Sequence, residues 1–233
     1  MLVDGPLLTP TLPQVPEAAA AMEAQGYDGA FTFEGPHDPF LPLVLAAEAT
    51  ERLELTTAVA IAFARSPMTL ASQAWDLQAL SGGRFHLGLG SQIKPHIERR
   101  FSMPWSAPAA RMRELVLAVR AIWATWQERT PLQFEGEHYT HTLMTPFFDP
   151  GPLECGPPAI WLGGVGPLMT EVAGEVADGF MIHPFCTERS LHEITLPALE
   201  QGRARPGARP GPVQVSLPVM IATGVDDEAL HAA

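Results

Sequence analysis

Side chains that can transfer protons gather in the segment FEGPHDPFLP, directly after a short apolar run. Glu34, His37 and Asp38 supply two carboxylates and an imidazole within a few residues. At the carboxyl end of a strand, such groups can donate or accept a proton during a reaction. The alternative is a structural loop, in which Asp38 or Glu34 caps the following helix and His37 is solvated. The residues alone leave both interpretations equally open.

Two further histidines stand where candidate strands end. His183 closes the segment GFMIHP, and His96 follows the segment LGLGSQ in IKPHIERR. An isolated histidine is more often structural or solvated than catalytic, but a position at a strand end favours a role at a ligand site. The chain has eight histidines and no HxH or HExxH pairing, so no metal site is expected.

A glycine-rich turn, Gly163-Gly164-Val165-Gly166, leads from a candidate strand into a helix. Glycines let successive N–H groups point at one anion, and the helix amino terminus adds partial positive charge. The pattern predicts a phosphate site, with an ordinary tight turn as the alternative. The strand ending at Gly90 has a G-x-G, but its sixth position is Ile93, which disfavours a dinucleotide fingerprint. What remains there is a strand end that lets a ligand approach the backbone.

Strands and helices that alternate along the chain must position these residues. The seven strand candidates are Leu2–Asp4, Gly29–Phe33, Leu55–Ile61, Phe85–Leu89, Ala159–Gly163, Gly179–His183 and Val213–Ala222. Repeated strand–helix units predict a parallel sheet, either open and doubly wound or closed as a (β/α)8 barrel. The final segment GVDDEALHAA begins a helix and then stops. We therefore expect an α/β fold of the TIM-barrel type, truncated after about seven strands.

The helices between the strands carry recognisable ends. Ser66 followed by Pro67 is an N-cap with a proline at the first helical position, and this helix is predicted over residues 68–80. Ser106 and Pro108 are predicted to begin a longer helix, in which apolar residues recur every three or four positions. Tryptophans on that apolar face are interpreted as core residues.

The regular spacing breaks between the fourth and fifth strand candidates. More residues separate these two strands than one helix needs. The additional residues include Leu132–Pro158, which is rich in proline, glycine and aromatic residues. Loops this long in a compact domain are usually functional or disordered. We predict an ordered insertion, within residues 93–158, over a ligand site, and an exposed connector at Gly202–Pro212. Residues 1–233 are expected to form a single barrel domain whose C-terminal units are missing.

Composition excludes several classes of protein. Of the 233 residues 46% are hydrophobic, enough for a sizeable core. The 26 acidic and 14 basic residues give a net charge of -12, so nucleic acid is not an expected partner. No apolar run reaches the roughly 20 residues of a bilayer span, and the first residues lack a signal-peptide pattern. Two isolated cysteines, Cys155 and Cys186, suit a reducing compartment, and we expect a cytoplasmic protein.

Several motifs together resemble the bacterial luciferase-like monooxygenase superfamily, and most closely its branch that depends on the deazaflavin coenzyme F420. They are ARSP after TTAVAI, the strand SGGRFHLGLGSQ, the turn PPAIWLGGVGP and the segment ADGFMIHP, with DPFLPL and HIERRF in support. The resemblance covers essentially the whole chain. It implies a (β/α)8 barrel with a flavin or deazaflavin in the mouth formed by the carboxyl ends of the strands.

The resemblance also implies which residues bind the cofactor. A non-prolyl cis peptide that supports the ring of the cofactor falls by position at Ala58–Val59. Gly90, Ser91 and Gln92 would line the ring or its side chain. Gly163 to Gly166 would hold the cofactor phosphate.

The resemblance assigns the proton-transfer groups less firmly. We expect Glu34 or His37 to transfer the proton and His96 or His183 to orient the substrate. Relatives with a glutamate shortly after the G-x-G strand differ from this chain, which has Ile93 in the corresponding place. The acid–base residue therefore stays open at this point.

Three functions follow from these observations. The leading hypothesis is an F420-dependent oxidoreductase that transfers a hydride between the deazaflavin and a small organic substrate. An FMN-dependent monooxygenase on the same barrel is the first alternative, because either cofactor would place a phosphate on the glycine turn. A barrel relative that acts only in binding or assembly, including association of two copies into a homodimer, is the second.

Overall fold

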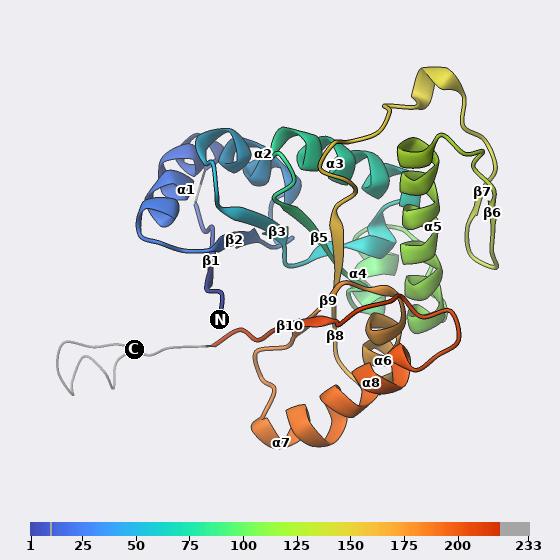
Figure 1. The fold of residues 1–233 in the computed structure, drawn as a ribbon. Coiled ribbons are helices and arrows are strands. Elements are labelled where there is room, and N and C mark those ends of the chain that lie inside the picture. Colours follow the sequence, from blue (N-terminus) through green and yellow to red (C-terminus); the bar gives the residue numbers. More distant parts are fainter. Residues whose placement is uncertain (10, 220–233) are drawn as a thin grey trace.

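A computed structural model describes residues 1–9 and 11–219 and contains one curled β-sheet with helices on its outer side (Figure 1). The sheet has eight strands in the order β1-β2-β3-β5-β8-β9-β10, with β4 paired to β5. They are β1 (Asp4–Pro6), β2 (Gly29–Thr32), β3 (Glu54–Thr57), β4 (Ala60–Ile61), β5 (Phe85–Gly90), β8 (Ala159–Gly164), β9 (Gly179–Ile182) and β10 (Gln214–Ser216). Every pairing in this sheet is parallel, which confirms the predicted α/β class.

Three strand candidates differ from the observed strands. The first, Leu2–Asp4, lies slightly before β1. The third, Leu55–Ile61, is divided into β3 and β4 by the Ala58–Val59 peptide, where the chain makes no ladder pairs with β5. Of the last, Val213–Ala222, only the first part forms β10, and residues 220–222 lie outside the described residues.

Helices follow most of the strands. They are α1 (Val15–Ala24), α2 (Phe40–Ala49), α3 (Pro67–Leu80), α4 (Lys94–Arg99), α5 (Pro108–Glu128), α6 (Pro167–Val176), α7 (Glu188–Ser190) and α8 (Leu196–Arg203). Ser66 caps α3 as predicted, because its hydroxyl accepts a hydrogen bond from the Thr69 N–H at 3.1 Å. The longer helix begins at Pro108, also as predicted. The residue that precedes it is Ala107 in a left-handed conformation, so Ser106 is not its N-cap.

The two faces of the sheet differ in burial. Leu55, Leu87 and Leu162 are fully buried against the helices. Their chain neighbours point to the opposite face, which the helices do not cover, and His86 and Trp161 are only partly buried there. The hydrophobic core therefore lies between the sheet and the helix layer.

Three tryptophans join α3 to α5 within this core. The ring of Trp75 lies 6.4 Å from that of Trp123 and 5.3 Å from that of Trp126, measured between centroids. All three side chains are buried, and the Trp123 indole donates to the carbonyl of Ala71 at 3.1 Å. The interpretation of the α5 tryptophans as core residues is confirmed.

The long insertion is ordered, and it lies against the outer helices (Figure 1). Its hairpin consists of β6 (Phe134–Glu135) and β7 (Thr140–His141). The Glu114 carboxylate on α5 accepts hydrogen bonds from the N–H groups of residues 137–139 at 3.0, 2.7 and 2.6 Å. Farther along, the Trp75 indole donates to the Gly151 carbonyl. These contacts place the hairpin and the residues after it on the sides of α3 and α5, and a position of the insertion over a ligand site stays a prediction.

The connector at Gly202–Pro212 is largely exposed, as predicted, and it is nevertheless tied to the helix layer. Its first residues complete α8, and Gly202 is buried. Arg205 pairs with Glu171 and Glu175 of α6, and Arg209 pairs with Asp178. From the other side, Arg113 on α5 donates two hydrogen bonds to Glu175. Carboxylates of residues 171–178 thus bind this segment to the helix layer.

Glu175 makes this network sensitive to pH. Burial by itself would raise the pKa of Glu175, but the hydrogen bonds and charges of Arg113 and Arg205 lower it below its ordinary value of 4.5. The stabilisation is therefore complete above pH 4.5 and is lost as the pH falls through the lower folded-state pKa. We expect Glu175→Gln to reduce the free energy of unfolding by about 2 kcal/mol at pH 7, measured by urea denaturation.

The difference between the wild type and Glu175→Gln should shrink in acid, because protonation removes the same charge from the wild type. Glu193→Gln is the matched control, since Glu193 forms a pair with Arg189 in which both side chains are exposed. That change should cost less than about 0.5 kcal/mol. A Glu175→Gln difference that stays constant down to pH 3 would contradict the role assigned to the ion pairs.

Candidate functional site

The predicted site residues lie together at one edge of the sheet, which we call the mouth. The mouth consists of the carboxyl ends of the strands and the segments that follow them. These segments are residues 33–39 after β2, 58–66 after β3 (which include β4), 91–100 after β5, 165–166 after β8 and 183–187 after β9. Because all these strands are parallel, their carboxyl ends meet at the same edge. Parallel α/β folds place their ligand sites at this edge.

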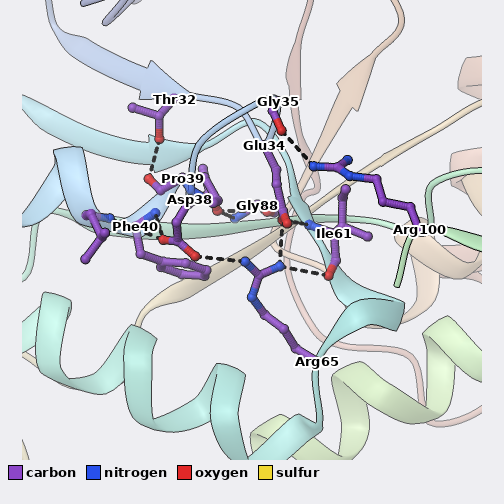
Figure 2. A network of polar contacts seen from close by, with 12 residues as sticks. Thr32, Glu34, Gly35, Asp38, Pro39, Phe40, Ile61, Arg65, Gly88 and Arg100 are labelled. Carbon is purple, nitrogen blue, oxygen red and sulfur yellow. Dashed lines mark hydrogen bonds and ion pairs between the residues drawn. The ribbon is translucent and has the colours of Figure 1, made fainter. Parts of the chain in front are cut away.

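Glu34 is ion-paired within the mouth (Figure 2). Its Oε2 accepts hydrogen bonds from Arg65 Nη1 at 2.6 Å and from the Ile61 N–H at 2.8 Å. Only 7% of the Glu34 side chain and 13% of the Arg65 side chain are exposed, so water and salt screen this pair weakly. Its other oxygen, Oε1, accepts no hydrogen bond from the described residues. Oε1 is therefore the atom of Glu34 that is left for a ligand.

Asp38 uses both of its oxygens for structure. Its Oδ1 accepts from the Phe40 N–H at 2.8 Å and so caps α2, as the structural alternative predicts. Its Oδ2 accepts from Arg65 Nη2 at 3.0 Å (Figure 2). The Arg65 guanidinium lies 5.5 Å from the centroid of the Phe40 ring. Arg65 consequently connects the loop after β2 with the loop after β4.

Arg65 and Arg100 were not predicted as site residues, and the structure places both in the mouth. The Arg100 Nη2 donates to the Gly35 carbonyl at 2.9 Å, which ties the segment after β5 to the loop after β2 (Figure 2). A usable signal is present for Arg65, since it directly precedes the capped helix α3 at the same edge as two carboxylates. No feature of the sequence predicts the position of Arg100, because its partner is a backbone carbonyl, which every residue has.

The three candidate histidines are exposed at the mouth. His37 and His96 make no side-chain hydrogen bonds with the described residues. His183 accepts a hydrogen bond at Nδ1 from the Phe185 N–H at 3.3 Å, and its ring lies 5.2 Å from the Phe185 ring. The structure thus brings the histidines to the same edge of the sheet, with no direct contact among them.

The Ala58–Val59 peptide bond is cis, as the resemblance implies. The Ala58 N–H donates to the Thr32 carbonyl at 2.6 Å, and the Val59 carbonyl accepts from the Glu34 N–H at 3.2 Å. The segment between β3 and β4 is therefore fixed to the end of β2. Its place beside Glu34 connects the candidate cofactor segment with the candidate proton-transfer loop.

The side chain of Val59 lies against two glycine strand ends. A Cβ atom on Gly90 would be 2.5 Å from Val59 Cγ2, and one on Gly163 would be 2.9 Å from Val59 Cγ1. Neither position can hold a side chain without displacing Val59. Glycine at the ends of β5 and β8 thus gives the mouth an apolar floor made by the Val59 methyl groups.

Ser91 and Gln92 form a tight bend after β5. Gln92 has a φ of 58°, in the left-handed region that few residues other than glycine adopt. Its Oε1 accepts from the Ile93 N–H at 2.9 Å, and the Ser91 hydroxyl donates to the Gln92 carbonyl at 3.2 Å. Both side chains are partly occupied by local bonds that hold the bend before α4.

The glycine turn after β8 fits an anion. Gly166 has a φ of 85°, and α6 begins at the next residue, Pro167. Val165 is 72% exposed, and within the described residues no acceptor pairs with the N–H groups of Val165 or Gly166. Exposed N–H groups beside a helix amino terminus form a ready anion site. The chemistry predicted for this turn is therefore available, while its role stays a prediction.

A second polar group lies at the opposite end of the uncovered face of the sheet. His86 stacks on Trp161 with ring centroids 5.9 Å apart, and its Nδ1 lies 4.0 Å from Glu54. Burial raises the pKa of Asp4 above its ordinary value, and the negative charges of Glu54 and Asp28 add to this shift. This group could not be predicted from the sequence, because alternation within short strands does not show which face of the sheet the helices cover.

The described residues contain no grouping of three or more histidine, cysteine, aspartate or glutamate side chains with the arrangement of a metal site. Among the helices described, none combines the length and the apolar character that a membrane span requires.

Comparisons with known proteins agree with this geometry. The family described as luciferase-like monooxygenase matches residues 2–233. The chain is 55% identical over 222 residues to the uncharacterized protein Rv1360 of Mycobacterium tuberculosis, covering 95% of this chain and 65% of that protein. It is 34% identical over 205 residues to Rv3520c of the same species, provisionally named a coenzyme F420-dependent oxidoreductase, covering 83% of this chain and 57% of that protein.

Solved structures agree on the fold. EDTA monooxygenase from Chelativorans sp. BNC1 superposes with a TM-score of 0.78 at 17% identity, covering 100% of this chain and 65% of that one. At this identity the similarity establishes the fold alone. The chain spans less than two thirds of the length of each of these three proteins.

The parallel half-barrel and its glycine-floored mouth define a member of the TIM-barrel type of α/β enzyme fold. More narrowly, the chain belongs to the luciferase-like monooxygenase family.

Proposed function

We propose that the chain is part of an oxidoreductase that uses the deazaflavin coenzyme F420 to transfer a hydride to or from a small organic substrate. The observation that carries the proposal is the arrangement of the mouth. There the Val59 methyl groups lie over Gly90 and Gly163, beside a turn whose N–H groups at residues 165 and 166 have no acceptor among the described residues. The name given to Rv3520c supports F420 over other cofactors of the same class.

The residues of the mouth fit such a cofactor. The methyl groups of Val59 offer a flat apolar support for a ring system, bordered by Ala58, Gly90 and the bend at residues 91–92. Within the glycine turn of residues 163–166, the N–H groups of Val165 and Gly166 would donate hydrogen bonds to the phosphate, and the start of α6 adds favourable charge. When bound, the deazaflavin supplies the carbon that gives or takes the hydride.

Proton transfer falls to the loop after β2 in this proposal. His37 is exposed and makes no hydrogen bonds with the described residues, so it can approach a substrate freely. Glu34 offers only Oε1, because Oε2 is bound to Arg65 and to the Ile61 N–H. We therefore assign proton transfer to His37 with Glu34 as the neighbouring carboxylate, and orientation of the substrate to His96 and His183.

Gly163→Ala tests the proposed cofactor site. Titration of the purified protein with F420, followed by the fluorescence of the cofactor, should show saturable binding to the wild type. The new methyl group would lie 2.9 Å from Val59 Cγ1 and would displace the floor of the mouth. We expect F420 binding to weaken by about tenfold or more.

Gly211→Ala is the control for a glycine-to-alanine change that strains the chain away from the mouth, because Gly211 has a φ of 98° and precedes β10 at the opposite end of the sheet. This variant should bind F420 as the wild type does. Tight binding of FMN without binding of F420 would overturn the proposal in favour of a flavin-dependent monooxygenase. Binding of neither cofactor would overturn it in favour of a role in binding or assembly.

A further inference from the structure

The helix α4 and the residue after it, Arg100, carry a group of positive charges that no carboxylate of the described residues neutralises. A surface pocket of about 300 Å³ is lined by Pro95, His96, Arg99 and Arg100. The remaining charged residues of α4 are Lys94 and Glu98. They pair with each other at 3.8 Å, so their opposite charges cancel. The two guanidinium groups and the imidazole at this pocket have no carboxylate partner among the described residues.

This lack of partners sets the pocket apart from other arginines of the chain. Most of the described arginines pair with a carboxylate, as Arg65, Arg113, Arg120 and Arg205 do. The exceptions outside this pocket are engaged elsewhere. Arg84 donates to five carbonyl or hydroxyl oxygens, and Arg111 donates to Tyr139 and Pro104.

Arg100 is held in place for binding, and Arg99 is free to bind. One Arg100 nitrogen donates to the Gly35 carbonyl, and the guanidinium lies 4.8 Å from the centroid of the Phe101 ring. These two contacts orient its remaining N–H groups. Arg99 makes no hydrogen bond with the described residues. A guanidinium fork matches the two oxygens of a carboxylate or phosphate.

The location links this pocket to the proposed function. The helix α4 follows the end of β5, and Arg100 reaches the carbonyl of Gly35, the residue after Glu34 (Figure 2). The chain carries a net charge of -12, which repels an anionic ligand from most of the surface. A compact group of uncompensated positive charge at the mouth would give such a ligand both attraction and a fixed position.

We propose that the pocket of His96, Arg99 and Arg100 binds an anionic group, a carboxylate or a phosphate, of a ligand that enters the mouth. This inference deepens the proposed function and rests on it for the location of the reaction. The anionic group belongs either to the substrate or to the cofactor, at a place separate from the glycine turn after β8.

Inorganic phosphate is the probe for this site, and the imidazole signals of His96 in NMR spectra are the readout. The His96→Gln variant assigns those signals among the eight histidines. Phosphate added to the cofactor-free protein should shift the His96 signals in a saturable manner. We expect Arg99→Gln to weaken this binding by about tenfold, because it removes one charged donor.

Two variants separate this effect from loss of folding or of overall charge. Arg99→Gln breaks no hydrogen bond among the described residues, so its thermal unfolding should match that of the wild type. Arg52→Gln removes the same charge from an exposed side chain, before β3 at the opposite end of the sheet. It should leave phosphate binding at His96 unchanged. Equal weakening by both variants would overturn the proposal, and so would the absence of any His96 shift.

The F420-bound protein distinguishes the two sources of the anion. If the substrate supplies it, phosphate still shifts His96 in the loaded protein and Arg99→Gln leaves F420 affinity unchanged. If the cofactor supplies it, F420 blocks the phosphate shift and Arg99→Gln weakens F420 binding. Both results support the pocket. If F420 fails to bind at all while phosphate still binds at His96, the proposed function fails and the anion pocket stands.

Discussion

Replacing Gly88 with alanine is expected to lower the free energy of unfolding by about 3 kcal/mol. A Cβ atom at this position would lie 1.7 Å from the Thr57 carbonyl oxygen and 2.7 Å from Met181 Cε. The methionine can move aside, but the carbonyl is backbone. It is held because the Thr57 hydroxyl donates to the Gly88 carbonyl at 2.8 Å and accepts from the Gly88 N–H at 2.9 Å. Urea denaturation at neutral pH measures the change.

Gly35→Ala is the matched control for Gly88→Ala. A Cβ atom there would meet only the Phe33 ring, at 3.4 Å and beyond, which is ordinary contact. The Gly35 carbonyl that Arg100 binds is kept. We expect this change to cost less than about 0.5 kcal/mol. Equal stabilities of the two variants would mean that β3 can move away from β5 at little cost in free energy. That result would contradict the destabilisation expected from the close approach of the Thr57 carbonyl to Gly88.

Replacing Arg65 with methionine is expected to destabilise the protein by about 2 to 4 kcal/mol. The Glu34 side chain is only 7% exposed, and without Arg65 it would keep a buried negative charge with the Ile61 N–H as its remaining partner. The capping carboxylate Asp38 would lose its cation as well. Methionine retains much of the packing of the aliphatic part of arginine. The loss of stability therefore measures mainly the removal of the positive charge.

A double-mutant cycle isolates the pair. Glu34→Gln removes the charge and keeps an acceptor for the Ile61 N–H. The double variant Glu34→Gln/Arg65→Met should therefore be more stable than Arg65→Met alone, with a coupling energy of about 1 to 3 kcal/mol. Arg189→Met, in an exposed pair with Glu193, should change stability by less than about 0.5 kcal/mol. Strict additivity of the two changes at residues 34 and 65 would contradict the proposed ion pair.

The elements of the fold could be predicted from the sequence because their signals are local. The cap at Ser66, the proline that begins α3 and the glycines at strand ends act within a few residues of the chain. Alternating strands and helices then leave few topologies. The division of the third strand was not predicted, since the loss of ladder pairs around the Ala58–Val59 peptide depends on how β3 and β4 meet β5, which is distant in the sequence.

The location of the candidate site could be predicted from the sequence, but the roles of its residues could be predicted only in part. Parallel strands bring their carboxyl ends together, so Glu34, His37 and the glycine turn were expected at one edge. The partner of Glu34 could not be read from the sequence, because Arg65 is far from it along the chain and meets it only in the folded molecule. The attachment of the insertion could not be read from the sequence for the same reason, because it depends on Glu114 of α5.

The hydrogen bonds of Arg65 and Arg100 divide the mouth into two parts that can diverge differently in evolution. The loops after β2, β4 and β5 are tied to one another through Glu34, Asp38 and Gly35, so a change in one disturbs the others. The loops after β8 and β9 form only local side-chain bonds among the described residues. Their sequences can therefore vary one at a time, and new ligand preferences would arise most readily from that side of the barrel.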